Sequence, residues 1–169
     1  MLYLFFYKSI TMKKIFFTTL LFASFAFGQT ELPSLTLKDL DNQDININSD
    51  FSEADKLYVF SFWATWCAPC IRELAAINEN YEEWQEEINF EVIAVSIDDS
   101  RTKKRVNAMV NGKGWPYKIL LDTNHDLKRA LSIINVPYLI VVKNNKIVHI
   151  ANGYTEGAEE ELYQTLKGL

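Results

Sequence analysis

Apolar and polar positions change their spacing along the chain, and each spacing predicts a different element. Residues 34–47 alternate between apolar and polar on both sides of an Asp-Asn-Gln-Asp turn, which predicts a β-hairpin. Residues 57–64 and 89–98 are apolar runs rich in β-forming residues, typical of strands buried on both faces. Residues 69–86 repeat apolar positions every three or four residues, which predicts an amphipathic helix.

The remaining chain continues to alternate between helical and strand patterns. The expected elements are a helix over 102–112 ended by Gly112, a strand over 117–122, a short helix over 125–133, strands over 138–143 and 146–153 around an Asn144-Asn145 turn, and a helix over 156–168. This order predicts an α/β sandwich whose sheet is partly parallel and partly antiparallel.

The first 28 residues have the layout of a secretory signal peptide. Lys13 and Lys14 precede an apolar run of 13 residues, which is too short to cross a bilayer because a spanning helix needs about 20. We expect cleavage before Gln29, with an uncleaved anchor as the alternative. Residues 1–11 have no evident purpose, and Met12 is a second candidate for the true start.

The chain that remains, residues 29–169, has the size and composition of one globular domain. Removing three lysines with the signal leaves 14 basic and 22 acidic groups, a net charge of −8. Such an acidic protein is a poor partner for nucleic acid.

The only two cysteines, Cys67 and Cys70, form a C-x-x-C pair that could hold a metal, act as a staple, or react as thiols. A structural zinc site needs four ligands, and His125 and His149 lie 55 and 79 residues past Cys70, a spacing that fits no finger or ribbon. We therefore expect no metal. We interpret His149 as structural and His125 as an exposed residue at a helix start.

A permanent staple also explains the pair poorly, because closing a two-residue loop removes little entropy from the unfolded chain. Two sulfurs one helical turn apart suit a redox couple, in which one thiolate attacks a disulfide and the other resolves the mixed disulfide. The pair falls between a buried strand and the first turn of a helix, where backbone amides stabilise a thiolate. We expect Cys67 to be the exposed attacking residue beside Trp66, and Cys70 to be shielded.

The segment "FWATWCAPCIREL" resembles the active site of thioredoxin-fold proteins, and most closely that of secreted TlpA/ResA-like thiol-disulfide oxidoreductases. The resemblance extends over residues 31–169. It implies a thioredoxin-like three-layer sandwich with a mixed central sheet, an N-terminal hairpin and an inserted strand-helix unit. The inserted unit would be "VIAVSID" and the helix that follows it.

The resemblance also assigns further site residues. It makes Val136-Pro137 a cis peptide bond that faces the cysteines, with the Val136 backbone free to pair with an extended substrate. From the sequence alone, a trans proline at the start of a strand would be expected. Glu73 matches a glutamate that handles protons under the cysteine pair; an ordinary exposed helix glutamate is the alternative.

Three positions depart from the family pattern. Ser61 replaces the buried aspartate that cytoplasmic thioredoxins carry six residues before the first cysteine, which leaves Glu73 as its substitute. Ala75 replaces a proline that kinks the active-site helix, so a straighter helix is expected. Tyr138 follows the cis-proline where threonine is common, so substrate preference cannot be transferred from the family.

These features predict a thiol-disulfide oxidoreductase of the cell envelope or periplasm that reduces protein disulfides, without cofactor, as a monomer. By resemblance, a membrane thiol-electron donor recharges it, and apocytochrome c is one of several substrates that fit. The alternatives are an oxidase or isomerase of the same fold, a redox-inert binding module, and a thiol peroxidase, although the peroxidase run PxxxTxxC is absent from the sequence.

Overall fold

The computed structural model describes residues 31–169. The predicted signal peptide, residues 1–28, lies outside the described residues, so its cleavage and the boundary at residue 29 stay predictions. Among residues 31–169, none of the helices combines the length and apolar composition needed to cross a membrane.

Seven strands and four helices make up this part of the chain. The strands are β1 (Thr36–Asp39), β2 (Asp44–Asn46), β3 (Leu57–Trp63), β4 (Phe90–Ser96), β5 (Lys118–Leu121), β6 (Tyr138–Lys143) and β7 (Lys146–Asn152). The helices are α1 (Ala68–Glu87), α2 (Lys104–Lys113), α3 (Asp126–Ala130) and α4 (Ala158–Gly168). Each predicted element is confirmed, with ends that differ by a few residues.

The strands form one mixed sheet in the order β2-β1-β5-β4-β3-β6-β7. β3, β4 and β5 are parallel neighbours, while β1, β2, β6 and β7 pair antiparallel. The N-terminal hairpin therefore extends the sheet beyond β5. The resemblance marks β4 and α2 as an inserted unit, and β4 is the central strand of the sheet.

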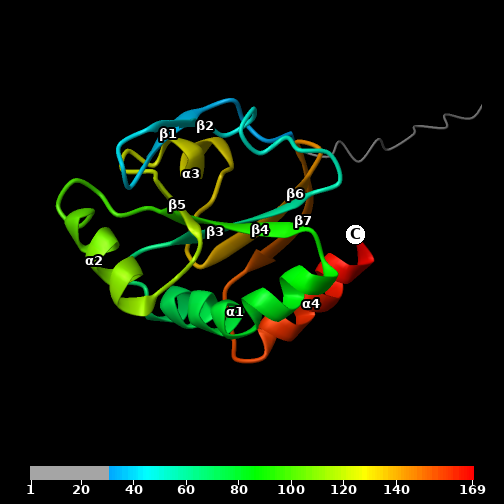
Figure 1. Cartoon of the computed structure of the whole chain (residues 1–169). Helices are drawn as coiled ribbons and strands as arrows, with labels where there is room; N and C mark the ends of the chain where they lie inside the picture. Colours follow the sequence, from blue (N-terminus) through cyan, green and yellow to red (C-terminus); the bar gives the residue numbers. More distant parts are fainter. Residues whose placement is uncertain (1–30) are drawn as a thin grey trace, which may run out of the picture.

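Helices cover both faces of the sheet, so the predicted three-layer sandwich is confirmed (Figure 1). The β3–β4 and β4–β5 connections are crossovers between parallel neighbours, and their right-handedness puts α1 and α2 on the same face. α4 lies beside α1 on that face, and α3 covers the opposite face (Figure 1).

β3 positions the cysteine pair. All seven of its residues are buried, as its apolar run predicts for a strand covered on both faces. It ends at Trp63, four residues before Cys67, and α1 then runs uninterrupted for 20 residues. Ala75 lies within this helix, where the family's proline would interrupt the backbone hydrogen bonds.

The prediction that Gly112 ends its helix was wrong. α2 continues to Lys113, and Gly114 forms the C-cap in the left-handed region with φ of 67°. The Gly114 N–H donates to the carbonyls of Val110 and Asn111, which closes the last turn. Either glycine could serve as a cap on sequence grounds, and the structure uses the second.

Candidate active site

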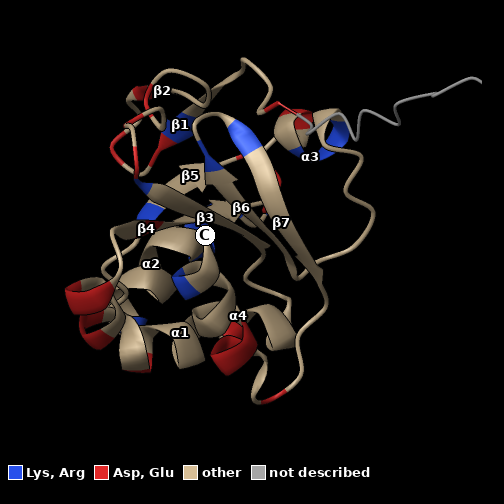
Figure 2. Ribbon diagram, turned by 90° about the vertical axis from the view of Figure 1, so that its right-hand side faces the viewer, with Lys and Arg blue, Asp and Glu red and all other residues tan. Residues whose placement is uncertain are grey.

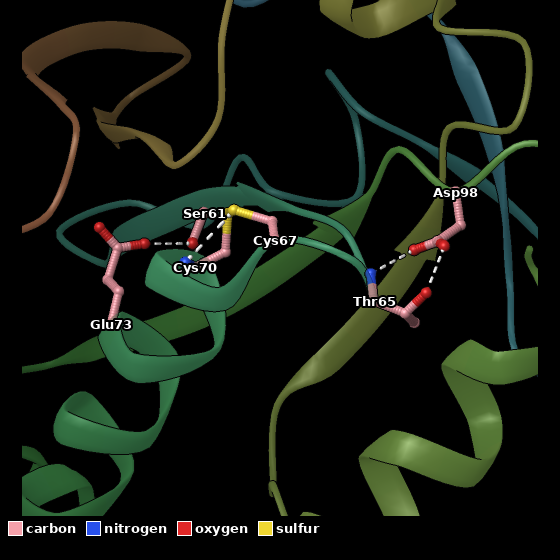
Figure 3. Close-up of a disulfide and its surroundings, with 6 residues drawn as sticks. All are labelled: Ser61, Thr65, Cys67, Cys70, Glu73 and Asp98. Carbon is pink, nitrogen blue, oxygen red and sulfur yellow. Dashed lines mark hydrogen bonds between the residues drawn. A yellow bond between two sulfur atoms is a disulfide. The ribbon is translucent and has the colours of Figure 1, made fainter.

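Cys67 and Cys70 form a disulfide at the amino end of α1, with their Cα atoms 5.3 Å apart (Figure 3). Cys67 is the N-cap residue, and the Cys70 N–H donates to the Cys67 Sγ at 3.3 Å. Pro69 lies in the first helical turn, where its missing N–H costs no helical hydrogen bond. The sulfur of Cys67 thus lies where amides and the helix dipole stabilise negative charge.

The expected difference in exposure between the two cysteines is present but small. Cys70 is fully buried, whereas Cys67 keeps 5% of its surface exposed. The prediction that Cys67 is exposed was therefore wrong for this disulfide form, because the sulfur packs back over the first turn of α1. The adjacent side chain of Trp66 is 60% exposed instead.

Glu73 faces inward from the next turn of α1, with only 5% of its surface exposed. Its neighbour Arg72 points to solvent, as expected for adjacent residues on a helix. The Ser61 hydroxyl, itself fully buried on β3, donates to Glu73 Oε2 at 2.7 Å (Figure 3). The carboxyl group thus lies next to Ser61, the position where cytoplasmic thioredoxins carry an aspartate.

Burial raises the pKa of Glu73 from 4.5 to about 7, although the hydrogen bond from Ser61 opposes this shift. Removing a carboxylate from water disfavours its charged form, and one neutral hydroxyl donor compensates only part of that cost. The outcome is a buried acid that can both take up and release a proton near neutral pH.

The Val136-Pro137 peptide bond is cis, as the resemblance implies. Phe62 near the end of β3 pairs with Tyr138 at the start of β6, so the cis bond lies at the same edge of the sheet as the loop to Cys67. Neither the N–H nor the C=O of Val136 is hydrogen-bonded to another of the described residues. Nearby in sequence, Ile134 is 81% exposed.

A second buried carboxylate, which the sequence did not single out, fixes the loop before the cysteines. Asp98 is fully buried and accepts hydrogen bonds from the Thr65 N–H at 2.8 Å and the Thr65 hydroxyl at 2.6 Å (Figure 3). The Ser96 hydroxyl donates to the same carboxylate at 2.9 Å. The sequence did contain a signal for this contact. Asp98 lies two residues after β4, which is parallel to β3, and the carboxyl ends of parallel strands meet at one edge of the sheet.

The two histidines lie apart from the disulfide. His125 was expected to be exposed, which was wrong: it is half-buried, and its Nε2 lies 2.9 Å from the Ile97 carbonyl oxygen. His149 is half-buried on β7, opposite Val141 of β6. Within residues 31–169, no group of three or more His, Cys, Asp or Glu side chains is placed to hold a metal ion.

Comparisons with known proteins agree with this site. The sequence matches the AhpC/TSA family over residues 29–150. The thiol-disulfide oxidoreductase ResA of Bacillus thuringiensis subsp. konkukian is 28% identical over 140 residues, which cover 82% of this chain and 76% of that protein. The ResA protein of Bacillus subtilis is 25% identical over 125 residues, 73% of this chain and 66% of that protein.

Solved structures agree with the fold. A thioredoxin-like protein from Porphyromonas gingivalis is 42% identical with a TM-score of 0.72, and the match covers 82% of this chain and 90% of that one. StoA from Bacillus subtilis is 20% identical with a TM-score of 0.63, and that match covers 79% of this chain and 96% of that one. The chain therefore belongs to the AhpC/TSA family, and it is a thiol-disulfide oxidoreductase with a C-x-x-C redox pair.

Proposed function

We propose that this protein is a protein-disulfide reductase of the cell envelope. One observation carries the proposal: a buried carboxylic acid, Glu73, follows the C-x-x-C disulfide by one turn at the amino end of α1 and is held there by Ser61. A reductase needs an activated thiolate to attack and a group that removes the proton of the second thiol. In this site Cys67 is the candidate thiolate, and Glu73 is the candidate group that removes the proton of Cys70.

The reduced protein starts with Cys67 as a thiolate, stabilised by the amino end of α1. The thiolate attacks one sulfur of a substrate disulfide, forms a mixed disulfide and releases the first substrate thiolate. Glu73 accepts the proton of Cys70, and the Cys70 thiolate attacks the Cys67 sulfur. The second substrate thiolate leaves, two electrons have passed to the substrate, and the protein carries the Cys67–Cys70 disulfide.

Substrate polypeptides would bind along the cis-proline segment. The unpaired backbone groups of Val136 can add an extended strand at the edge beside Pro137, and the exposed Trp66 and Ile134 offer apolar contact on either side. Tyr138, half-buried at the start of β6, would narrow this groove.

The reductase direction requires an electron supply, because an oxidising compartment holds no reducing buffer. The predicted signal peptide favours an envelope location, and a membrane thiol-electron donor would then re-reduce the Cys67–Cys70 disulfide. We expect a monomer with no cofactor, since the two cysteines carry both electrons.

The direction is tested by the reduction potential of the Cys67–Cys70 couple, measured by equilibration with glutathione mixtures. A value near −270 mV, similar to that of thioredoxin, is expected for a reductase. A value near −120 mV would identify an oxidant and refute the proposed direction. Cys67→Ser, which cannot form the couple, provides the baseline.

The substrates are tested by trapping in cells with Cys70→Ala, which leaves the mixed disulfide on Cys67 unresolved. The double variant Cys67→Ser with Cys70→Ala is the matched control, because it folds around the same site without the attacking sulfur. Envelope proteins captured by the first variant and absent with the second support the proposal. Equal recovery with both variants contradicts it.

A further inference from the structure

A cavity of about 480 Å³ lies beside the buried acid, between α1, β7 and the first turn of α4. We term it the β7–α4 cavity. Glu73 lines its inner end, and His149, Tyr154, Glu159 and Glu161 provide ionisable groups along its wall. The site described above does not use these four residues.

The cavity joins the buried acid to the surface. At the inner end, Glu73 and Leu162 are buried, whereas Glu161 and Ile150 at the rim are exposed. Figure 2 shows the acidic first turn of α4, to which Glu161 belongs. One continuous space therefore runs from Glu73 to solvent on the side of α4.

Pairing across three strands shows why the cavity begins at the Ser61–Glu73 pair. Ser61 pairs with Leu139, and Leu139 pairs with Ala151, so the three side chains share one face of the sheet. Leu139 and Ala151 line the cavity. Ser61, whose hydroxyl binds Glu73, is thus a cross-strand neighbour of residues that line the cavity.

A β-bulge directs His149 into this space. The register of β6 and β7 shifts between Val141 and Val142, so that His149, rather than Val148, lies opposite Val141. Paired residues point to the same face, and Val141 shares its face with Leu139, two residues away. Without the extra residue, His149 would point to the other face of the sheet, away from the cavity.

Proton exchange at Glu73 needs such an opening. Cys70 and Ser61 are fully buried and Cys67 is nearly so, so the disulfide side gives the carboxyl little access to water. Each water molecule occupies about 30 Å³, so the cavity has room for several, in contact with ionisable side chains.

We propose that the β7–α4 cavity is the path by which Glu73 exchanges its proton with solvent, with His149 as the proton carrier along it. This inference rests on the proton role of Glu73 in the proposed function. In each reductive turnover Glu73 takes one proton from Cys70, and the path returns that proton to solvent. In re-reduction the same path supplies one proton to Glu73, which passes it back to Cys70.

The other groups around Glu73 do not offer an equivalent carrier. Burial and the hydrogen bond to Glu159 raise the pKa of Tyr154 to about 12, so Tyr154 stays protonated and orients the Glu159 carboxylate at 2.7 Å. Burial also raises the pKa of Tyr117, whose hydroxyl donates to the Leu74 carbonyl at 2.8 Å.

The path is tested by blocking it without changing Glu73. Ala151→Leu adds bulk to the cavity wall beside Leu139, and His149→Leu removes the carrier. Ala108→Leu, an equal change at an exposed position of α2, is the matched control. The readout is the steady-state rate of disulfide reduction with excess dithiothreitol, measured against pH and buffer concentration, because Glu73 must return its proton to solvent before each new turnover.

We expect Ala151→Leu and His149→Leu to slow steady-state turnover by about tenfold, less than the loss of a complete acid-base group. The rate of His149→Leu should recover with added imidazole, which enters the open cavity. The reduction potential should not change, because the path affects rates and not equilibria. A merely structural defect would not respond to imidazole.

Two outcomes overturn the inference in distinguishable ways. If Glu73→Gln slows steady-state turnover and both cavity variants react like Ala108→Leu, the proton leaves by another way, and the proposed function stands. If Glu73→Gln reacts as fast as the wild type, the proton role of Glu73 fails and the path fails with it.

Discussion

Replacing Glu73 by glutamine should change how the stability of the disulfide form depends on pH. The pKa of Glu73 is raised from 4.5 to about 7 by burial. Between these pH values the folded protein holds a proton that the unfolded chain has released, so the free energy of unfolding falls as pH rises. Each pKa unit corresponds to about 1.36 kcal/mol, so the ionised group costs the folded state about 3 kcal/mol above pH 7.

Most of this cost develops between pH 5 and pH 8. The linkage relation gives about 1 kcal/mol at pH 5 and about 3 kcal/mol at pH 8, a change of about 2 kcal/mol. Glutamine keeps the size of the side chain and can still accept the Ser61 hydrogen bond, but it does not titrate. The variant should therefore become more stable relative to the wild type by this amount as pH rises.

Urea unfolding of both proteins at a series of pH values between 5 and 8 measures the difference directly. Glu79→Gln, at an exposed position of the same helix, is the control and should follow the wild type. Parallel curves for the wild type and Glu73→Gln would show that Glu73 does not hold a proton in the fold, and would refute the assignment of a raised pKa.

Three further changes test individual contacts. Ser61→Ala removes the hydrogen bond that lowers the pKa of Glu73, so this pKa should rise further, as measured by carbon NMR of the carboxyl group. An unchanged pKa would contradict the hydrogen bond. Asp98→Ala leaves the half-buried Thr65 N–H and hydroxyl without their acceptor and should lower the unfolding free energy by about 3 kcal/mol in urea, whereas Asp41→Ala at the exposed hairpin turn should have a much smaller effect. Trp84→Ala removes the ring that stacks on Tyr163 between α1 and α4, with ring centroids 5.1 Å apart, and should lower the free energy of unfolding by about 3 kcal/mol in urea. A loss as small as that expected for Trp66→Ala, at an exposed position, would show that this packing contributes little.

The sequence predicted the parts of this molecule that depend on local pattern. The apolar run of β3 and the three- and four-residue spacing of α1 fix which faces are buried. The inward position of Glu73 was predicted from the family resemblance. The family resemblance added the cis bond before Pro137. None of these needed contacts between distant segments.

Two of the missed features, the contact of Asp98 with Thr65 and the orientation of His149, depend on pairing between distant segments. Thr65 and Asp98 are 33 residues apart, and only the parallel pairing of β3 with β4 brings the carboxylate to the loop. His149 looked like an ordinary strand residue because its face depends on a bulge, and a shift of one position reverses which side a strand residue faces. Local periodicity contains no information about that shift.

On the proposed function, the Ser61–Glu73 pair keeps a buried acid near the cysteines while the residue that supplies it changes place. A thioredoxin carries its buried acid on the strand, whereas here the acid comes from α1 and the strand supplies a hydroxyl 2.7 Å away. Because Glu73 comes from the helix, its side chain also lines the cavity between α1, β7 and α4. The Glu73 carboxyl group thus accepts a hydrogen bond from Ser61 and also borders the β7–α4 cavity. On the proposed function, serine in place of aspartate on β3 leaves the proton role to Glu73, whose side chain also lines the β7–α4 cavity.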